Sequence, residues 1–140
     1  MEEVISLRHT KYISPRNDTK GKINGIYIIK GVLLAYIVSL VAFLIIGGLI
    51  HFTKISEDIV PVSVNIVSAL SVLIGGLYVA KNVDTRGWLN GGIMGLLYVV
   101  ILLALSLFLV PDTSLGISSF VKLALGFVIG ALGGILGVNI

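Results

Sequence analysis

The last stretch of the chain, LALGFVIGALGGILGVNI (residues 123–140), is apolar, uncharged and rich in glycine. Inside a water-soluble helix, each glycine costs about 1 kcal/mol relative to alanine. In lipid, by contrast, small residues let two helix backbones approach closely, and dispersion forces then hold the helices together. The stretch therefore predicts a membrane-spanning helix that packs tightly against another helix.

The composition of the whole chain indicates the same class of protein. Hydrophobic residues make up 56% and charged residues 12% of the 140 residues, whereas soluble domains contain about 25% charged residues. The mean hydropathy is +1.08, and too few polar residues remain to cover a surface in water. The chain has no cysteine, which excludes disulfides and thiolate metal sites.

Four apolar stretches follow a polar N-terminal segment, and each reaches the roughly 20 residues that a spanning helix needs. They cover about residues 25–52, 59–80, 90–110 and 117–140. Lipid offers no partner for free backbone groups, so each stretch is expected to be helical. The prediction is an all-α, polytopic membrane protein in which four transmembrane helices form two helical hairpins of the same orientation. Residues 1–24 are expected to form a basic cytoplasmic tail ahead of a transmembrane domain over 25–140.

Lysine and arginine are distributed unequally between the two predicted sides of the membrane. One side carries most of them: Arg8, Lys11, Arg16, Lys20, Lys22, Lys30, Lys81 and Arg86. The other side carries Lys54 and Lys122. Because cytoplasmic loops carry an excess of Lys and Arg, both termini and the middle loop are predicted to be cytoplasmic, with the protein in the cell membrane. A pI near 9.3 would suit a nucleic-acid partner, but basic residues flanking apolar runs indicate membrane topology instead.

Two segments resemble each other, which indicates an internal repeat. ALSVLIGGL (69–77) and ALGFVIGAL (124–132) agree at five of nine positions. A weaker match relates Asn24-Gly25 to Asn90-Gly91. Together they predict two copies of a helical hairpin, related by an axis along the membrane normal as in parallel transporter repeats.

The glycines of the last helix recur at helical spacing, as in a glycine zipper. Gly126, Gly130 and Gly134 lie four residues apart, and Gly130, Gly133 and Gly137 continue the same side. The second helix offers a ridge of small residues that runs parallel to it. That ridge consists of Ser68, Ser71, Gly75 and Val79. The contact is expected either within one chain or between copies of the chain.

The connecting segments carry helix caps and interfacial residues. Ser56 or Asp58 can cap the second helix, and Asp112, Thr113 or Ser114 can cap the fourth. At the cytoplasmic interface, Asp84, Arg86, Trp88 and Asn90 gather before the third helix. Asn90 is expected to cap that helix, Asp84 and Arg86 to form an ion pair or a cap, and Trp88 to lie in the aromatic belt.

The predicted spans carry no ionisable residue at mid-depth, where functional membrane sites usually have one. Asn65, in the second helix with serines nearby, is the best candidate for a buried polar contact. It is expected to form a hydrogen bond between helices or to contact a substrate. His9 and His51 fall on opposite sides of the membrane and cannot share a metal. No catalytic residue, cofactor site or metal site is predicted, and the chain is not expected to be an enzyme.

The segment IGGLYVAKNVDTRGWLNGGIMGLLY (74–98), followed by GFVIGALGGILGVNI (126–140), resembles the YrzE-like family. These are small four-helix membrane proteins of low-GC Gram-positive bacteria. The resemblance covers roughly residues 31–140 and implies an integral membrane protein of uncharacterised function, without a catalytic residue.

Two functions are compatible with these features. The first is a non-enzymatic helix bundle that associates with or modulates another membrane protein or lipid, or associates with itself as a homo-oligomer. The alternative is a small oligomeric transporter or channel. The glycine-rich surfaces favour the first function, and the hairpin repeat with the Ser/Asn face of the second helix favours the second.

Overall fold

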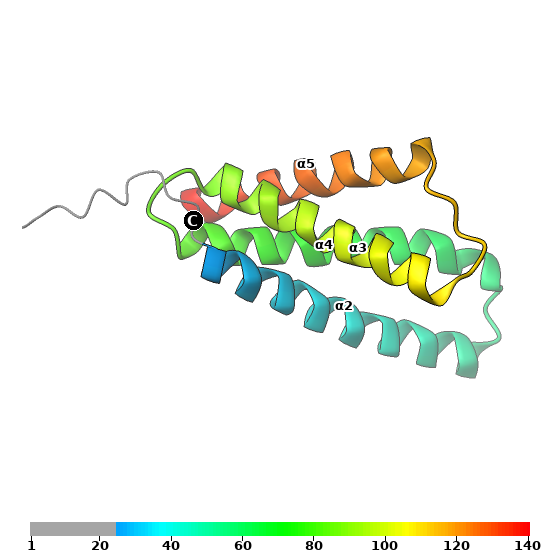
Figure 1. The fold of residues 1–140 in the computed structure, drawn as a ribbon. Helices are drawn as coiled ribbons and strands as arrows, with labels where there is room; N and C mark the ends of the chain where they lie inside the picture. The colour runs from blue at the N-terminus through cyan, green and yellow to red at the C-terminus, as the bar shows by residue number, and fades with distance from the viewer. Residues whose placement is uncertain (1–24) are drawn as a thin grey trace, which may run out of the picture.

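The computed structural model describes residues 25–140, which form four long helices and one short 3-10 helix. In chain order these are α2 (Gly25–Thr53), η1 (Glu57–Ile59), α3 (Val60–Lys81), α4 (Gly87–Leu109) and α5 (Ile117–Asn139). The predicted basic tail, residues 1–24, lies outside the described residues. The long helices run up and down beside one another, and α2–α3 and α4–α5 form two hairpins that point the same way (Figure 1).

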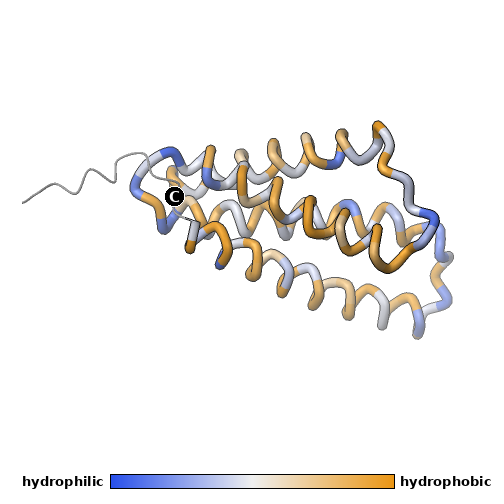
Figure 2. Tube along the Cα trace, in the orientation of Figure 1, coloured by the Kyte–Doolittle hydropathy of each residue, from blue (hydrophilic) through white to orange (hydrophobic). Residues whose placement is uncertain are grey.

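All four long helices are long and apolar enough to cross a membrane. Hydrophilic residues gather in the connections at both ends of the bundle, and the helices between them are mainly hydrophobic (Figure 2). The chain is therefore a polytopic membrane protein, and the predicted fold class is confirmed. At 29 residues, α2 measures about 43 Å, which exceeds the roughly 30 Å hydrocarbon core of a bilayer.

The start of α2, the α3–α4 connection and the end of α5 lie together at one end of the bundle (Figure 1). We call this the terminal end. The opposite end, which holds the α2–α3 and α4–α5 connections, is called the open end. Lys30, Lys81 and Arg86 belong to the terminal end, and Lys54 and Lys122 to the open end.

Several helix starts differ from the prediction. Helix α4 begins at Gly87, so Asn90 lies inside its first turns and the expectation that Asn90 caps the helix is wrong; Arg86 is the N-cap residue. Helix α5 is capped by Gly116 without a side-chain hydrogen bond, because Asp112, Thr113 and Ser114 lie too far before its first turn.

The start of α3 follows both residues that the sequence offered as its cap, so the prediction that Ser56 or Asp58 caps this helix is wrong. The Ser56 hydroxyl accepts from the Asp58 backbone amide at 3.5 Å, and this cap serves η1. Ile59 is the N-cap residue of α3, and Pro61 follows in the first turn, where its missing amide proton costs little.

Burial is uneven along the bundle. Buried residues gather in the half that adjoins the terminal end: none occurs in α2 after Ser39, in α3 before Val67 or in α4 after Tyr98. In α5, Ser119 is the one buried residue before Gly126. The four helices are thus closely packed in the terminal half, and the open half leaves large apolar side chains uncovered.

Candidate functional site

The closest helix contact in the terminal half joins α4 to α5 through glycines on both helices. A Cβ atom added to Gly130 would meet the Gly91 carbonyl oxygen and lie 3.0 Å from the Gly95 Cα atom. A Cβ added to Gly91 would lie 2.9 Å from the Gly134 Cα atom. The two backbones therefore touch, and a side chain at these positions would force them apart. We call this contact the glycine seam, formed by Gly87, Gly91 and Gly95 of α4 with Gly126, Gly130 and Gly134 of α5.

Helix α3 packs against a neighbouring face of α5. A Cβ added to Gly133 would lie 2.5 Å from the Leu73 carbonyl oxygen, and one added to Gly137 would lie 2.6 Å from that of Leu77. Gly76 lies against α5 as well, because its added Cβ would lie 2.6 Å from the Gly130 carbonyl oxygen. The glycines of α5 thus serve two contacts at once, one with α3 and one with α4.

The predicted α3 ridge faces a different neighbour from the one expected. A Cβ added to Gly75 would meet the Met94 side chain of α4 and lie 2.8 Å from the Gly31 carbonyl oxygen of α2. Val79 likewise contacts Gly31. Ser71 is fully buried, whereas Ser68 is half-buried. The assignment of Gly75 and Val79 to the α5 contact is therefore wrong. Helix α3 packs against all three other long helices, and the residue that faces α5 is Gly76, the next one along the chain after Gly75.

Asn65, the predicted intramembrane polar contact, lies exposed on the outside of α3. It precedes the first buried residue of that helix, Val67, and so belongs to the open half. The expectation that Asn65 bonds between helices of the bundle is wrong, because no neighbouring helix covers this turn.

Four hydroxyl-bearing residues lie near the middle of α2, α3 and α4; Ser39, Ser71 and Tyr98 are buried, and Tyr36 is half-buried. Tyr36 Oη donates to the Tyr98 carbonyl oxygen at 3.1 Å, and the two rings pack at a tilt of 36° with centroids 4.7 Å apart. Ser39 Oγ donates to the Tyr36 carbonyl oxygen at 2.9 Å. Ser71 lies one turn from Gly75 toward the open end, and Tyr98 lies one turn from Met94 in the same direction. Because Gly75 contacts Met94, Ser71 and Tyr98 lie at the same level along the bundle. We call Tyr36, Ser39, Ser71 and Tyr98 the hydroxyl layer.

Sequence reasoning missed this layer. A lone tyrosine or serine in an apolar helix is an ordinary residue, and only the packing of three helices brings these four together. A signal was present nonetheless, because Tyr36, Ser71 and Tyr98 each occur near the centre of a predicted span.

The residues predicted at the cytoplasmic interface lie at the terminal end. Arg86 has a left-handed backbone with φ of 53°, a conformation that residues other than Gly, Asn and Asp seldom adopt. Asn90 is buried, and its Nδ2 donates to the carbonyl oxygens of Thr85 at 3.3 Å and Arg86 at 3.2 Å. This amide therefore holds the connection onto the start of α4. Asp84 and Trp88 are exposed beside it.

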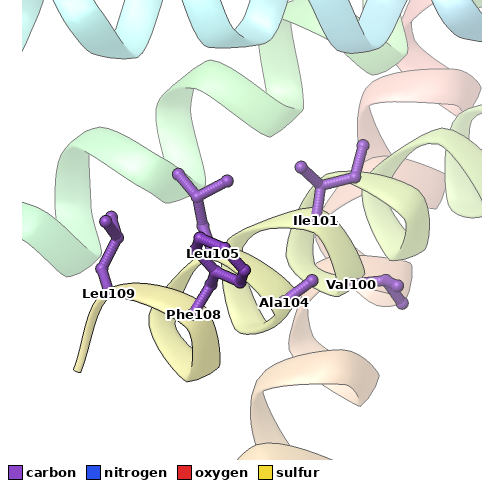
Figure 3. A pocket seen from close by; sticks show the side chains of 6 residues that line it. All are labelled: Val100, Ile101, Ala104, Leu105, Phe108 and Leu109. Atoms are coloured by element: carbon purple, nitrogen blue, oxygen red, sulfur yellow. The ribbon is translucent and has the colours of Figure 1, made fainter. Parts of the chain in front are cut away.

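An open hollow of about 580 Å³ lies along the uncovered half of α4. Figure 3 shows its lining, which comes entirely from that helix: Val100, Ile101, Ala104, Leu105, Phe108 and Leu109. These side chains are all hydrocarbon, so the hollow suits an apolar chain or a helix rather than a polar ligand. Over residues 25–140, no group of His, Cys, Asp and Glu side chains is arranged to hold a metal ion.

A family model described as "Protein of unknown function (DUF3792)" matches residues 24–137, which cover all four spans. The chain belongs to the DUF3792 family. No curated protein and no solved structure matches the chain. The DUF3792 match extends over both hairpins, so the glycine seam and the hydroxyl layer both lie within the family's shared region.

Proposed function

We propose that the protein is a non-enzymatic membrane bundle that associates with another membrane protein or with lipid through the open half of its helices. The contrast in burial between the two halves carries this proposal. Both halves expose apolar side chains, but only the terminal half is also held by backbone contacts between glycines. In the open half few residues are buried, and large side chains such as Leu44, Phe52 and Phe108 are exposed.

Two glycines of α2 support the same reading. A Cβ added to Gly47 or to Gly48 would meet nothing within 4 Å, although most helical glycines of this chain lie in close contacts. Small residues in a spanning helix favour the close approach of another helix. A second membrane protein, or a second copy of this chain, is therefore proposed to contact α2 in this region.

Two measurements test the proposal: crosslinking in the native membrane and the mass of the extracted particle. An unnatural photo-crosslinking residue should be placed at Phe108 or at Met94. The chain should then be extracted in mild detergent and its mass measured by native mass spectrometry. Crosslinking from exposed Phe108 to a defined protein or lipid, with none from buried Met94, is expected. Particles of 14.9 kDa without bound lipid, and no crosslink from Phe108, would contradict the proposal.

A small oligomeric transporter or channel is the second candidate, and the hydroxyl layer favours it. Polar groups at mid-depth in a span are common along solute pathways. Reconstituted vesicles that show uptake of a solute, abolished by a change within the layer, would support this function. Vesicles without flux of any tested solute would weaken it.

Several finer features belong to the same proposal. The two hairpins are proposed to be copies of one repeat, since Gly75 contacts Gly31 within the first hairpin and Gly130 contacts Gly91 within the second. The glycine seam is proposed to act as a glycine zipper. The protein is proposed to lie in the cell membrane with both termini in the cytoplasm, and its resemblance to the YrzE-like proteins stays a prediction.

A further inference from the structure

Two members of the hydroxyl layer are buried without a hydrogen-bond partner. Ser71 is 0% and Tyr98 1% exposed, and within the part of the chain that the structure describes, neither Ser71 Oγ nor Tyr98 Oη has a partner. Leaving a buried polar group unpaired costs about 1–3 kcal/mol. Lipid around the bundle cannot relieve this cost, because its hydrocarbon chains offer neither donors nor acceptors.

The other hydroxyls of the layer already use their protons elsewhere. Tyr36 donates to the Tyr98 carbonyl oxygen and Ser39 to the Tyr36 carbonyl oxygen. Ser71 and Tyr98 are therefore the two groups of the layer that can each still donate to an added molecule.

The surroundings limit what that molecule can be. The neighbouring buried side chains are hydrocarbon or thioether, among them Ala35, Val72 and Met94. An ion here would have no counter-charge, which makes its burial in a low-dielectric interior very costly. The molecule must also be small, because Met94 contacts Gly75 one turn away and the Tyr36 and Tyr98 rings pack against each other at this level. A neutral molecule that both donates and accepts hydrogen bonds meets these conditions.

We propose that Ser71 Oγ and Tyr98 Oη bind a water molecule at mid-depth in the bundle, which joins α3 to α4 through hydrogen bonds. Buried waters typically make about three hydrogen bonds to polar groups that would otherwise be unpaired. The two hydroxyls supply two of these bonds. This site is independent of the proposed association through the open half.

Nuclear magnetic resonance of the isotope-labelled full chain in detergent micelles tests the site. Cross-peaks between the water resonance and protons of Ser71 and Tyr98 are expected in the unaltered protein. Leu70 and Leu97 lie at a similar depth but are 54% and 37% exposed; they face detergent and should show no such cross-peak. These two leucines control for water that enters the micelle.

Two variants separate the proposed site from other sources of water. The double variant Ser71→Ala with Tyr98→Phe lacks both hydroxyl groups. The neighbouring amides, which are unchanged, should lose their cross-peaks with water in this variant. Ser39→Ala removes a hydroxyl that is bonded within its own helix and should keep them. Absence of water cross-peaks in the unaltered protein would overturn the proposal without need of a variant. So would cross-peaks of unchanged strength at the neighbouring amides of the double variant.

Discussion

Gly130 is the residue at which a missing side chain matters most. Its backbone lies against Gly91 and Gly95 of α4, and its carbonyl oxygen lies against Gly76 of α3. Three helices therefore meet at one position. In lipid, where the hydrophobic effect does not press helices together, such backbone contact is a main source of attraction.

Gly130→Ala should therefore lower the free energy of unfolding. The added methyl group would force two backbones apart, and overpacking of this kind costs about 1–3 kcal/mol. Gly47→Ala, measured like Gly130→Ala in the purified monomer, is the matched control, since nothing in the described chain lies within 4 Å of its added Cβ, and it should cause no loss. Unfolding in mixed detergents with increasing dodecyl sulfate gives both values. Equal stability of the two variants would contradict the glycine seam.

Arg86 and Lys54 have left-handed backbones, with φ of 53° and 51°. For residues other than glycine this conformation costs roughly 1–2 kcal/mol. Arg86→Gly and Lys54→Gly should each raise the free energy of unfolding by about 1 kcal/mol in the same assay. Lys122→Gly, which removes the same charge inside α5, should instead lower it by about 1 kcal/mol. A loss of stability at all three positions would contradict a left-handed backbone at Arg86 and Lys54.

Among the elements, α3 shows what could be predicted and what could not. Its existence and direction follow from an apolar run of spanning length between polar connections. Its neighbours do not, because Gly75 and Gly76 are adjacent in sequence yet face α2 and α5 respectively. Glycine at either position permits a close contact, so small residues alone cannot tell which helix will take it.

The predictions for Asn90 at the start of α4 and for Asn65 are wrong for related reasons. Asn90 has the residue type of a cap, but its amide bonds back to the preceding carbonyls from inside the helix. Asn65 lies in an apolar span, which predicts a buried polar group, but its side chain is exposed because burial depends on which side of the helix faces its neighbours. Side-chain chemistry predicts a hydrogen-bonding tendency, and only tertiary packing decides the partner.

The exposure of Asn65 makes a prediction for α3. Asn65→Leu should leave the free energy of unfolding unchanged or raise it, since no hydrogen bond within the bundle is lost and an apolar side chain suits lipid better. Ala35→Leu, at a position that is 0% exposed, should lower it by about 1–3 kcal/mol through overpacking. The chain should be measured as a purified monomer in detergent. A clear loss of stability in Asn65→Leu would place this side chain in a contact inside the bundle.

The whole molecule is a bundle of two hairpins with its described chain ends at one side. The number of spans and their alternating direction were predictable from hydropathy alone, because each span needs about 20 apolar residues. The closely packed terminal half and the uncovered open half were not, since all four spans are apolar over most of their length.

Cysteine labelling in intact cells tests the orientation of this bundle, and the absence of natural cysteine keeps the background low. Asp112→Cys and Glu57→Cys, at the open end, should react with a membrane-impermeant maleimide applied from outside. Asp84→Cys, at the terminal end, should react only after the cells are permeabilised. Labelling of Asp84→Cys in intact cells would reverse the proposed topology, and opposite behaviour of Asp112→Cys and Glu57→Cys would contradict the fold.

The contact of α5 with α4, backbone against backbone, can be measured directly by nuclear Overhauser effects between α-protons in detergent micelles. Effects that join Gly130 to Gly91 and Gly95 are expected, because the Gly95 Cα atom lies only 3.0 Å from where a Gly130 Cβ would be. If the α-protons of Gly130 instead show contacts only with detergent, the glycines of α5 face lipid and the packing described for this bundle is wrong.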